Sequence, residues 1–278
     1  MVNPVHCVVC SLALLLAATS LRTSPAQVSG EREVETLSTR DVGPFRPEHT
    51  PDVTKARRWI VEQTNAFRKE EGRDVLDRNQ RLDATAQDFA EYMAKTDRYG
   101  HTADGRSFPE RAERHEYESC LLAENIAYQF ATEGFTTETL AEQFVQGWIK
   151  SPGHRENMLK EHVTEIGVGI AGSDSTGIYY AVQLFGRPRA AAVAFAVENE
   201  TSQSVRYALG ERHFTLPARY RREHQLCVPA SLQLVAKDDA DPPQEGDARK
   251  LGTAIEPQQG ARYRVTLSDG RPVLIKED

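Results

Sequence analysis

The chain has 278 residues, a formal net charge of −7, 39% apolar residues and 27% charged residues. Nucleic-acid binding needs a concentrated basic face, so the acidic balance argues against a nucleic-acid partner. The length exceeds that of an average single domain and the apolar content is sufficient for a core. One large or two modest domains are therefore expected.

The N-terminus has the features of an export signal. The apolar run from Val8 to Ala18 is too short to cross a bilayer, which takes about 20 residues, but it suits the core of a signal peptide. Ser24 and Ala26 are small, so cleavage is expected after Ala26, with cleavage after Ser20 as the alternative. We therefore expect residues 1–26 to be a signal peptide of a secreted, periplasmic or extracellular protein that has no transmembrane span once the signal is removed.

The next segment, 27–51, is polar, contains several prolines and has no sustained period, which predicts a linker or pro-segment. Amphipathic stretches with apolar residues at helical spacing follow it. They predict helices from Pro51 to near Gly72, after Asn79, and after Thr137 until Pro152 ends the third.

Two strand-like runs, 163–171 and 178–185, come next and are joined by a polar hairpin candidate. Helices and strands interleave without βαβ regularity, which favours a layered helix–sheet–helix domain over residues 52–188. Short β-rich runs separated by turn residues then predict a small all-β sandwich or barrel over residues 189–278, so the overall fold class is α+β. The runs are 193–197, 205–209, 232–235, 261–267 and 272–275. Within this domain, 237–250 reads as a solvated loop.

Two cysteines, Cys120 and Cys227, lie outside the predicted signal peptide. In an exported protein they can form one disulfide that ties the two halves of the chain together. Two separate small buried thiols are the alternative, and the sequence leaves both open.

Several common enzyme motifs are missing from the sequence. It has no His-Glu-x-x-His zinc motif, no Gly-x-Ser-x-Gly nucleophile elbow, no phosphate-binding loop and no Gly-x-Gly-x-x-Gly fingerprint. These absences remove several enzyme classes but leave other hydrolases open. Three isolated histidines, His115, His213 and His224, have no partner in the sequence, so structural or surface roles are expected for them.

Five ordered motifs carry a family resemblance: "YGHTADGRSFPERA", "AENIA", "GWIKSPGHRENML", "HVTEIGVGI" and "YYAVQLFG". Their wording and order resemble the CAP superfamily (cysteine-rich secretory proteins, antigen 5 and pathogenesis-related-1 proteins), in its bacterial branch. The resemblance covers about residues 54–187. It implies an α-β-α sandwich with a cavity lined by two histidines and two acidic residues.

Carried over residue by residue, the resemblance assigns His101 and Glu124 to the first family histidine and glutamate. It assigns His162 to the second histidine. The second family glutamate falls on Ser151, so the set of four is incomplete as written. The groups that could replace the missing carboxylate are His154, Glu156 and Glu165.

We expect His101, Glu124 and His162 to converge at one cleft. Two imidazoles with a carboxylate can hold a divalent metal such as zinc, or the carboxylate can orient an imidazole for acid–base work. The residue types fit both roles.

Three function classes follow. The first, which the incomplete set and the missing nucleophile motif favour, is a non-catalytic extracellular module that binds a lipid, peptide or glycan. The second is a metal-assisted or His/Glu hydrolase, resembling a peptidase. The third is an envelope protein that binds a partner through its C-terminal domain.

Overall fold

The computed structural model describes residues 34–38, 47–236 and 250–277. The predicted signal peptide, most of the predicted linker and nearly all of the predicted loop 237–250 lie outside the described residues. Among the described helices, none is both long enough and apolar enough to span a membrane.

A four-stranded sheet forms the centre of the first half, with strands in the order β2-β5-β6-β4. The long strands β4 (Ser119–Gln129), β5 (Glu165–Gly172) and β6 (Tyr179–Pro188) pair antiparallel with one another, and the short β2 (Asp77–Arg78) runs parallel to β5. Strand β4 is therefore an outer strand, with one edge that no other strand of the sheet covers.

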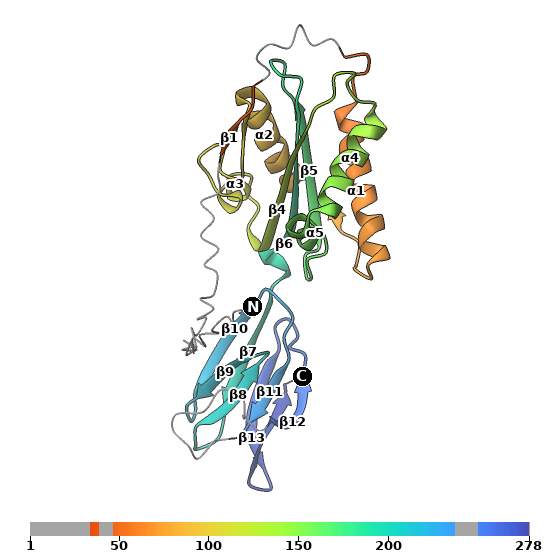
Figure 1. The fold of residues 1–278 in the computed structure, drawn as a ribbon. Coiled ribbons are helices and arrows are strands. Elements are labelled where there is room, and N and C mark those ends of the chain that lie inside the picture. Colours follow the sequence, from red (N-terminus) through yellow and green to blue (C-terminus); the bar gives the residue numbers. More distant parts are fainter. Residues whose placement is uncertain (1–33, 39–46, 237–249, 278) are drawn as a thin grey trace, which may run out of the picture. The chain divides into compact units, whose positions relative to one another are not determined.

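Helices cover both faces of this sheet (Figure 1). On one face, α1 (Val53–Glu70), α4 (Thr137–Lys150) and the short α5 (Pro152–Met158) pack against the sheet in one apolar core. On the other face, α2 (Gln80–Thr96) and α3 (Phe108–Arg114) form a second core with it. The predicted helix–sheet–helix layering is confirmed. A small pair of strands, β1 (Glu35–Thr36) and β3 (Arg98–Tyr99), lies outside the main sheet.

The three predicted helices begin where their capping residues place them. Asp52 accepts a hydrogen bond from the backbone of α1, Asn79 from that of α2 and Thr136 from that of α4. Such caps satisfy backbone donors that have no partner in the first helical turn.

Helix α2 lies unusually close to β5, and two glycines explain why. A side chain at Gly167 or Gly169 would come within 2.3 Å of the α2 backbone at Leu82 or Ala86. Only glycine leaves room for this approach, so the "GVG" sequence of β5 fixes the distance between helix and sheet.

The second half is all β and follows the 3-10 turn η1 (Arg189–Ala191). Its two four-stranded sheets have the orders β10-β7-β13-β14 and β12-β11-β8-β9. Side chains from both sheets form one core, so the sandwich is the form adopted. The strands are β7 (Val193–Asn199), β8 (Val205–Leu209), β9 (Arg212–Leu216), β10 (Arg221–Leu226), β11 (Leu232–Val235), β12 (Lys250–Ile255), β13 (Arg262–Ser268) and β14 (Arg271–Lys276).

Candidate functional site

The candidate site lies at strand β4, where neighbouring side chains point to opposite faces of the sheet. Ile126 belongs to the core beneath α2, whereas Ala123 belongs to the core beneath α1 and α4. By the same alternation, Glu124 lies on the α2–α3 face and Asn125 on the α1–α4 face. Each begins a separate polar network.

On the α2–α3 face, the Glu124 carboxylate is buried, with its side chain only 1% exposed. Its Oε1 lies 2.7 Å from Nδ1 of His101, and its Oε2 accepts a hydrogen bond of 2.7 Å from Nη2 of Arg111. A desolvated carboxylate is costly without such partners. The pairing also requires the His101 Nδ1 to carry the proton when Glu124 is ionised, which leaves Nε2 for a ligand.

Helix α3 positions Arg111 behind this pair. The helix begins with a capping box at Ser107, which sets Arg111 in its second turn. There Nη1 of Arg111 donates to a carboxylate oxygen of Asp104 and to the carbonyl of His101, both at 3.0 Å. The guanidinium also packs over the ring of Phe89, 3.5 Å from its centroid. These contacts fix both the arginine and the turn that carries His101.

On the α1–α4 face, the network consists of neutral amides. Asn125 donates through Nδ2 to the carbonyl of His154 and to Oε1 of Gln183, each at 3.1 Å. Asn157 donates to Oδ1 of Asn125 at 3.0 Å and to the carbonyl of Glu124 at 3.2 Å. Asn157 thus joins the two networks across β4 and anchors α5 to the strand.

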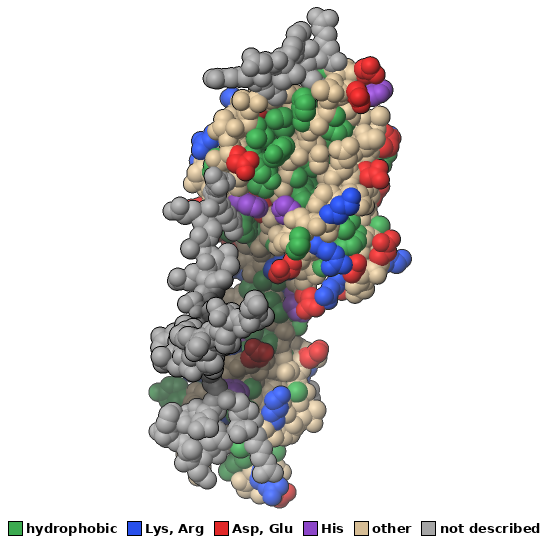
Figure 2. All heavy atoms as spheres, viewed as in Figure 1, with side chains coloured by type: hydrophobic (Ala, Val, Ile, Leu, Met, Phe, Trp, Pro, Cys, Tyr) green, Lys and Arg blue, Asp and Glu red, His purple; other side chains and the backbone are tan. Residues whose placement is uncertain are grey.

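The imidazole of His154 completes the site. Burial lowers the pKa of His154, and the nearby His101 lowers this pKa further, so the ring is neutral at pH 7. No hydrogen bond of the His154 ring is present within the described part of the chain, so its nitrogens are available to a ligand. Figure 2 shows histidine side chains at the surface of this half, near a patch of apolar side chains.

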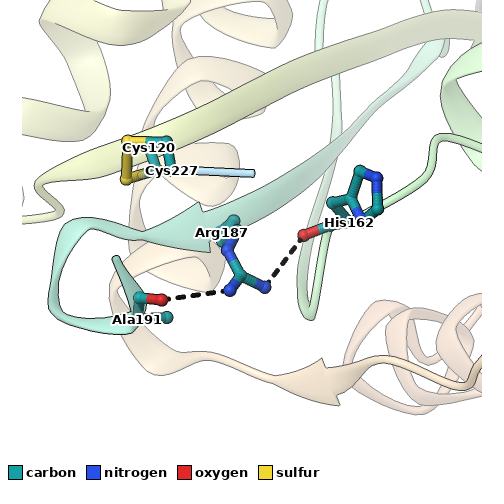
Figure 3. The surroundings of a disulfide bond; sticks show 5 residues. All are labelled: Cys120, His162, Arg187, Ala191 and Cys227. Carbon is teal, nitrogen blue, oxygen red and sulfur yellow. Dashed lines mark hydrogen bonds between the residues drawn. A yellow bond between two sulfur atoms is a disulfide. The ribbon is translucent and has the colours of Figure 1, made fainter. Parts of the chain in front are cut away.

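His162 does not lie with His101 and Glu124. It adopts a left-handed backbone conformation (φ 64°) before β5, and its side chain is exposed. In Figure 3, the His162 carbonyl faces Arg187, which donates to it at 3.4 Å, while the imidazole points away. The ring lines a hollow of about 720 Å³ together with Arg73 and Leu159. Asn125 binds the His154 backbone instead, so the structure brings His154 to β4.

The sequence of this first half matches a known protein family. Residues 61–185 match the model of the "Cysteine-rich secretory protein family", abbreviated CAP. The chain contains a CAP domain. The predicted resemblance to this family is confirmed over these residues.

Two curated relatives of this domain come from Bacillus subtilis, which is consistent with the bacterial branch that the wording of the motifs predicted. The chain is 27% identical over 159 residues to "Uncharacterized protein YkwD" of Bacillus subtilis (strain 168), a match that covers 54% of this chain and 59% of that relative. The chain thus spans less than two thirds of the relative's length.

Solved structures of similar fold include an SCP-domain extracellular protein of Bacillus anthracis str. Ames (25% identity, TM-score 0.42, 52% of this chain and 45% of that one). Another is an outer surface protein from Borrelia burgdorferi (20% identity, TM-score 0.44, 50% of this chain and 98% of that one).

The CAP-domain residues do not fit a bound metal ion. Across residues 34–38, 47–236 and 250–277, no group of three or more His, Cys, Asp or Glu side chains is placed to hold one. The expected set of His101, His162 and Glu124 is therefore not assembled. In addition, both oxygens of Glu124 already have partners, and the Arg111 cation at 2.7 Å would repel a second positive charge.

Three further candidates of the CAP domain lie outside the His101–Glu124–His154 arrangement. Ser151 lies between α4 and α5 and makes no side-chain cap. Glu165 accepts a hydrogen bond of 2.6 Å from the hydroxyl of Tyr117. Glu156 is exposed and lines the same hollow as His162.

A disulfide connects the CAP domain to the β sandwich. Cys120 at the start of β4 and Cys227 just after β10 are bonded across a separation of 107 residues (Figure 3). The sequence left open a disulfide or two separate buried thiols, and the structure contains the disulfide.

Sequence reasoning missed Arg111 and Asp104, and it offered His154 only as one of three groups that could replace the missing carboxylate. One signal was available, because His154 and Asn157 lie three residues apart and α5 begins at Pro152, so both face the same neighbour. The partners Arg111 and Asp104 had no comparable signal, since ion pairs of this kind depend on tertiary packing.

Proposed function

We propose that the CAP domain is an extracellular ligand-binding module whose site is formed by His101, Glu124 and His154 at the uncovered edge of β4. The observation that carries the proposal is the arrangement of the two imidazoles. They come from the two helical layers on opposite faces of the CAP-domain sheet, and each is positioned by a polar network: the Glu124–Arg111 pair on one face and the Asn125–Asn157 amides on the other. Such preorganised polar groups orient a ligand without rearranging when it binds.

Aromatic side chains farther along β4 support a ligand with an apolar or ring-shaped part. Tyr128 follows Glu124 on the same face of β4, is 40% exposed, and packs edge-on against Tyr99 at 4.9 Å. Phe130, just beyond the strand, is 39% exposed. Ligand sites usually combine apolar and aromatic walls with a few placed polar groups. A lipid, a peptide or a glycan would suit this combination.

The disulfide supports the extracellular part of the proposal. Disulfides persist in oxidising compartments and are rare in the cytosol of most organisms. Together with the predicted signal peptide, the Cys120–Cys227 bond favours a secreted or periplasmic protein. A partner that binds the C-terminal domain in the cell envelope stays a prediction.

A second candidate function, acid–base hydrolysis, rests on one specific contact. The 2.7 Å pairing of His101 with Glu124 is the geometry by which a carboxylate orients an imidazole and stabilises its protonated form. No serine or cysteine side chain in the described ranges hydrogen-bonds to His101, so His101 would have to activate water directly. Ligand binding needs no such activated water and is therefore the preferred function.

Ligand binding to the full-length protein provides the test. Palmitate, a muropeptide and a chito-oligosaccharide would each be titrated while the histidine ring signals are followed by NMR. We expect one of these probes to shift the His101 and His154 signals in a saturable way, and His154→Ala to weaken its binding about tenfold. His213→Ala, an exposed site on β9, is the matched control.

Two outcomes would count against the proposal. Binding that is unaffected by both His101→Ala and His154→Ala would place the site elsewhere. Cleavage of the muropeptide or oligosaccharide that His101→Ala abolishes would favour the hydrolase instead. Zinc chloride serves as a further probe, and stoichiometric zinc lost with His101→Ala would restore the metal hypothesis.

A further inference from the structure

The seam between β9 and β10 in the β sandwich contains an unusual set of side chains. These strands are outer strands of different sheets. On β9, Phe214 and Leu216 lie on the face that packs against the core. On β10, His224 and Leu226 likewise lie on the core-facing side. The rings of Phe214 and His224 meet across the seam, 5.0 Å apart.

The aromatic wall at this seam is held in place by several contacts. His224 stacks on Phe195 at 5.1 Å, and its Nε2 lies 2.7 Å from the hydroxyl of Tyr207. Tyr207 in turn stacks on Phe214 at 5.4 Å. Because Tyr207 and Phe195 are buried, the positions of His224 and Phe214 are fixed from the inside.

Two arginines lie against the same wall. The guanidinium of Arg212 lies 5.2 Å from the centroid of Phe214, and that of Arg222 lies 5.4 Å from it. Burial lowers the pKa of His224, and the charges of Arg222 and Arg212 lower it further. Both arginines are thus close enough to His224 for their charges to disfavour its protonated form.

No carboxylate among the described residues compensates these two charges. The adjacent Glu223 points to the outer face of its sheet, where it pairs with Arg221 at 2.9 Å. Neither Arg212 nor Arg222 takes part in an ion pair with any residue that the structure describes. This differs from the CAP domain, where Arg111 has two carboxylate partners. Two like charges held near one aromatic ring repel each other, and an anion between them would remove the repulsion.

We propose that Arg212 and Arg222 bind a phosphate or sulfate group at the β9–β10 seam, with Phe214 and His224 as the wall of the site. The planar guanidinium presents paired N–H donors that match two oxygens of a tetrahedral anion. Phosphate and sulfate esters of lipids or glycans offer the same group as the free ions. The site lies outside the CAP domain and does not depend on the function proposed for it.

The test is an NMR titration of the full-length protein with inorganic phosphate at constant ionic strength, using chloride as the replaced ion. The arginine Nε–H and His224 ring signals should shift in a saturable way at Arg212, Arg222 and His224. Inorganic sulfate and glycerol 3-phosphate are the other probes. Tighter binding of glycerol 3-phosphate than of phosphate would identify an ester as the ligand, and equal binding would identify the free ion.

Matched variants decide whether the site is specific. Arg212→Ala and Arg222→Ala should each weaken phosphate binding about tenfold, the loss of one charge-assisted pair. Arg222→Lys should recover only part of the affinity, because lysine lacks the paired donors. Arg221→Ala removes the same charge from the outer face of β10 and should leave the affinity within about twofold. An equal loss in Arg221→Ala, or the absence of saturable shifts, would overturn the proposal.

Discussion

The two halves of the molecule treat positive charge in opposite ways. In the CAP domain, Arg111 is buried between two carboxylates, and one of them, Glu124, also holds His101 at 2.7 Å. In the β sandwich, Arg212 and Arg222 share the surface of Phe214 and have no carboxylate partner among the described residues.

The difference separates two ways of building a binding site. Where every charge is paired inside the protein, the ion pairs fix the positions of the site residues. Contacts with a ligand then come from polar atoms that have no partner within the site, here the Nε2 of His101 and the ring of His154. Where cations are unpaired, the ligand itself must supply the missing charge. Substitutions that break the first kind of site should lower the free energy of unfolding strongly. Loss of the arginines from the second kind should leave the free energy of unfolding nearly unchanged.

The largest effect is expected from Arg111→Ala. It would leave the buried Glu124 carboxylate without its guanidinium, and breaking a buried pair in this way costs about 3–5 kcal/mol of unfolding free energy. Arg106→Ala is the control, because its side chain is 45% exposed and its contact with Asp104 is 3.4 Å, so about 0–1 kcal/mol is expected. Urea denaturation of both variants measures the difference. Equal losses would mean that burial of the pair is unimportant.

A smaller effect is expected from the neutral network on the other face of β4. Gln183 is fully buried, accepts from Asn125 at 3.1 Å and donates to the hydroxyl of Thr64 at 2.8 Å. Gln183→Ala removes one hydrogen bond from each of these partners within the core, which should lower the unfolding free energy by about 1–3 kcal/mol. Gln146→Ala, on the exposed face of α4, should change it by less than about 0.5 kcal/mol. A loss for Gln183→Ala as large as that of Arg111→Ala would contradict the ranking of charged above neutral networks.

The smallest effect concerns Asp97, which ends α2 in a left-handed conformation that asparagine also tolerates. Burial alone would raise the Asp97 pKa, but hydrogen bonds from Ser175, Thr176 and other hydroxyl groups outweigh it, so the pKa is lowered. The ionised form therefore stabilises the fold above the unfolded pKa of about 3.9, and this stabilisation is lost as the pH falls through the lower folded value.

Asp97→Asn should accordingly lower the free energy of unfolding by about 1 kcal/mol at pH 7. The difference in unfolding free energy from the parent protein should shrink below about pH 4. Urea titrations at several pH values measure it. A difference that stays constant down to pH 2 would show that the charge of Asp97 makes no contribution.

Local sequence signals predicted the amphipathic helices but missed several strands. α1, α2 and α4 were predicted because apolar spacing and capping residues act within a few neighbours. β4 was not predicted from its pattern, because Glu124 and Asn125 interrupt the apolar alternation in the middle of the strand. β9, β10 and β12 were missed because they are outer strands that carry mostly charged or exposed residues.

The candidate site was predicted in part and for a clear physical reason. The resemblance identified His101 and Glu124, which the structure pairs. It assigned the second histidine to His162, whereas the structure brings His154 to β4. Residue type and spacing suit both histidines, and they are distinguished by the exposed ring of His162 and by the hydrogen bond from Asn125 to the His154 carbonyl. Such a choice depends on tertiary contacts that one sequence does not display.

The most direct test of the site is an NMR pH titration of the His154 ring in the full-length protein. If His154 and His101 share one site, the His154 pKa lies below 6.5 and rises in His101→Gln, which removes the neighbouring imidazole, but not in His162→Gln. A His154 pKa at or above 6.5 that responds to neither substitution, or responds to His162→Gln alone, would contradict the site described for this CAP domain.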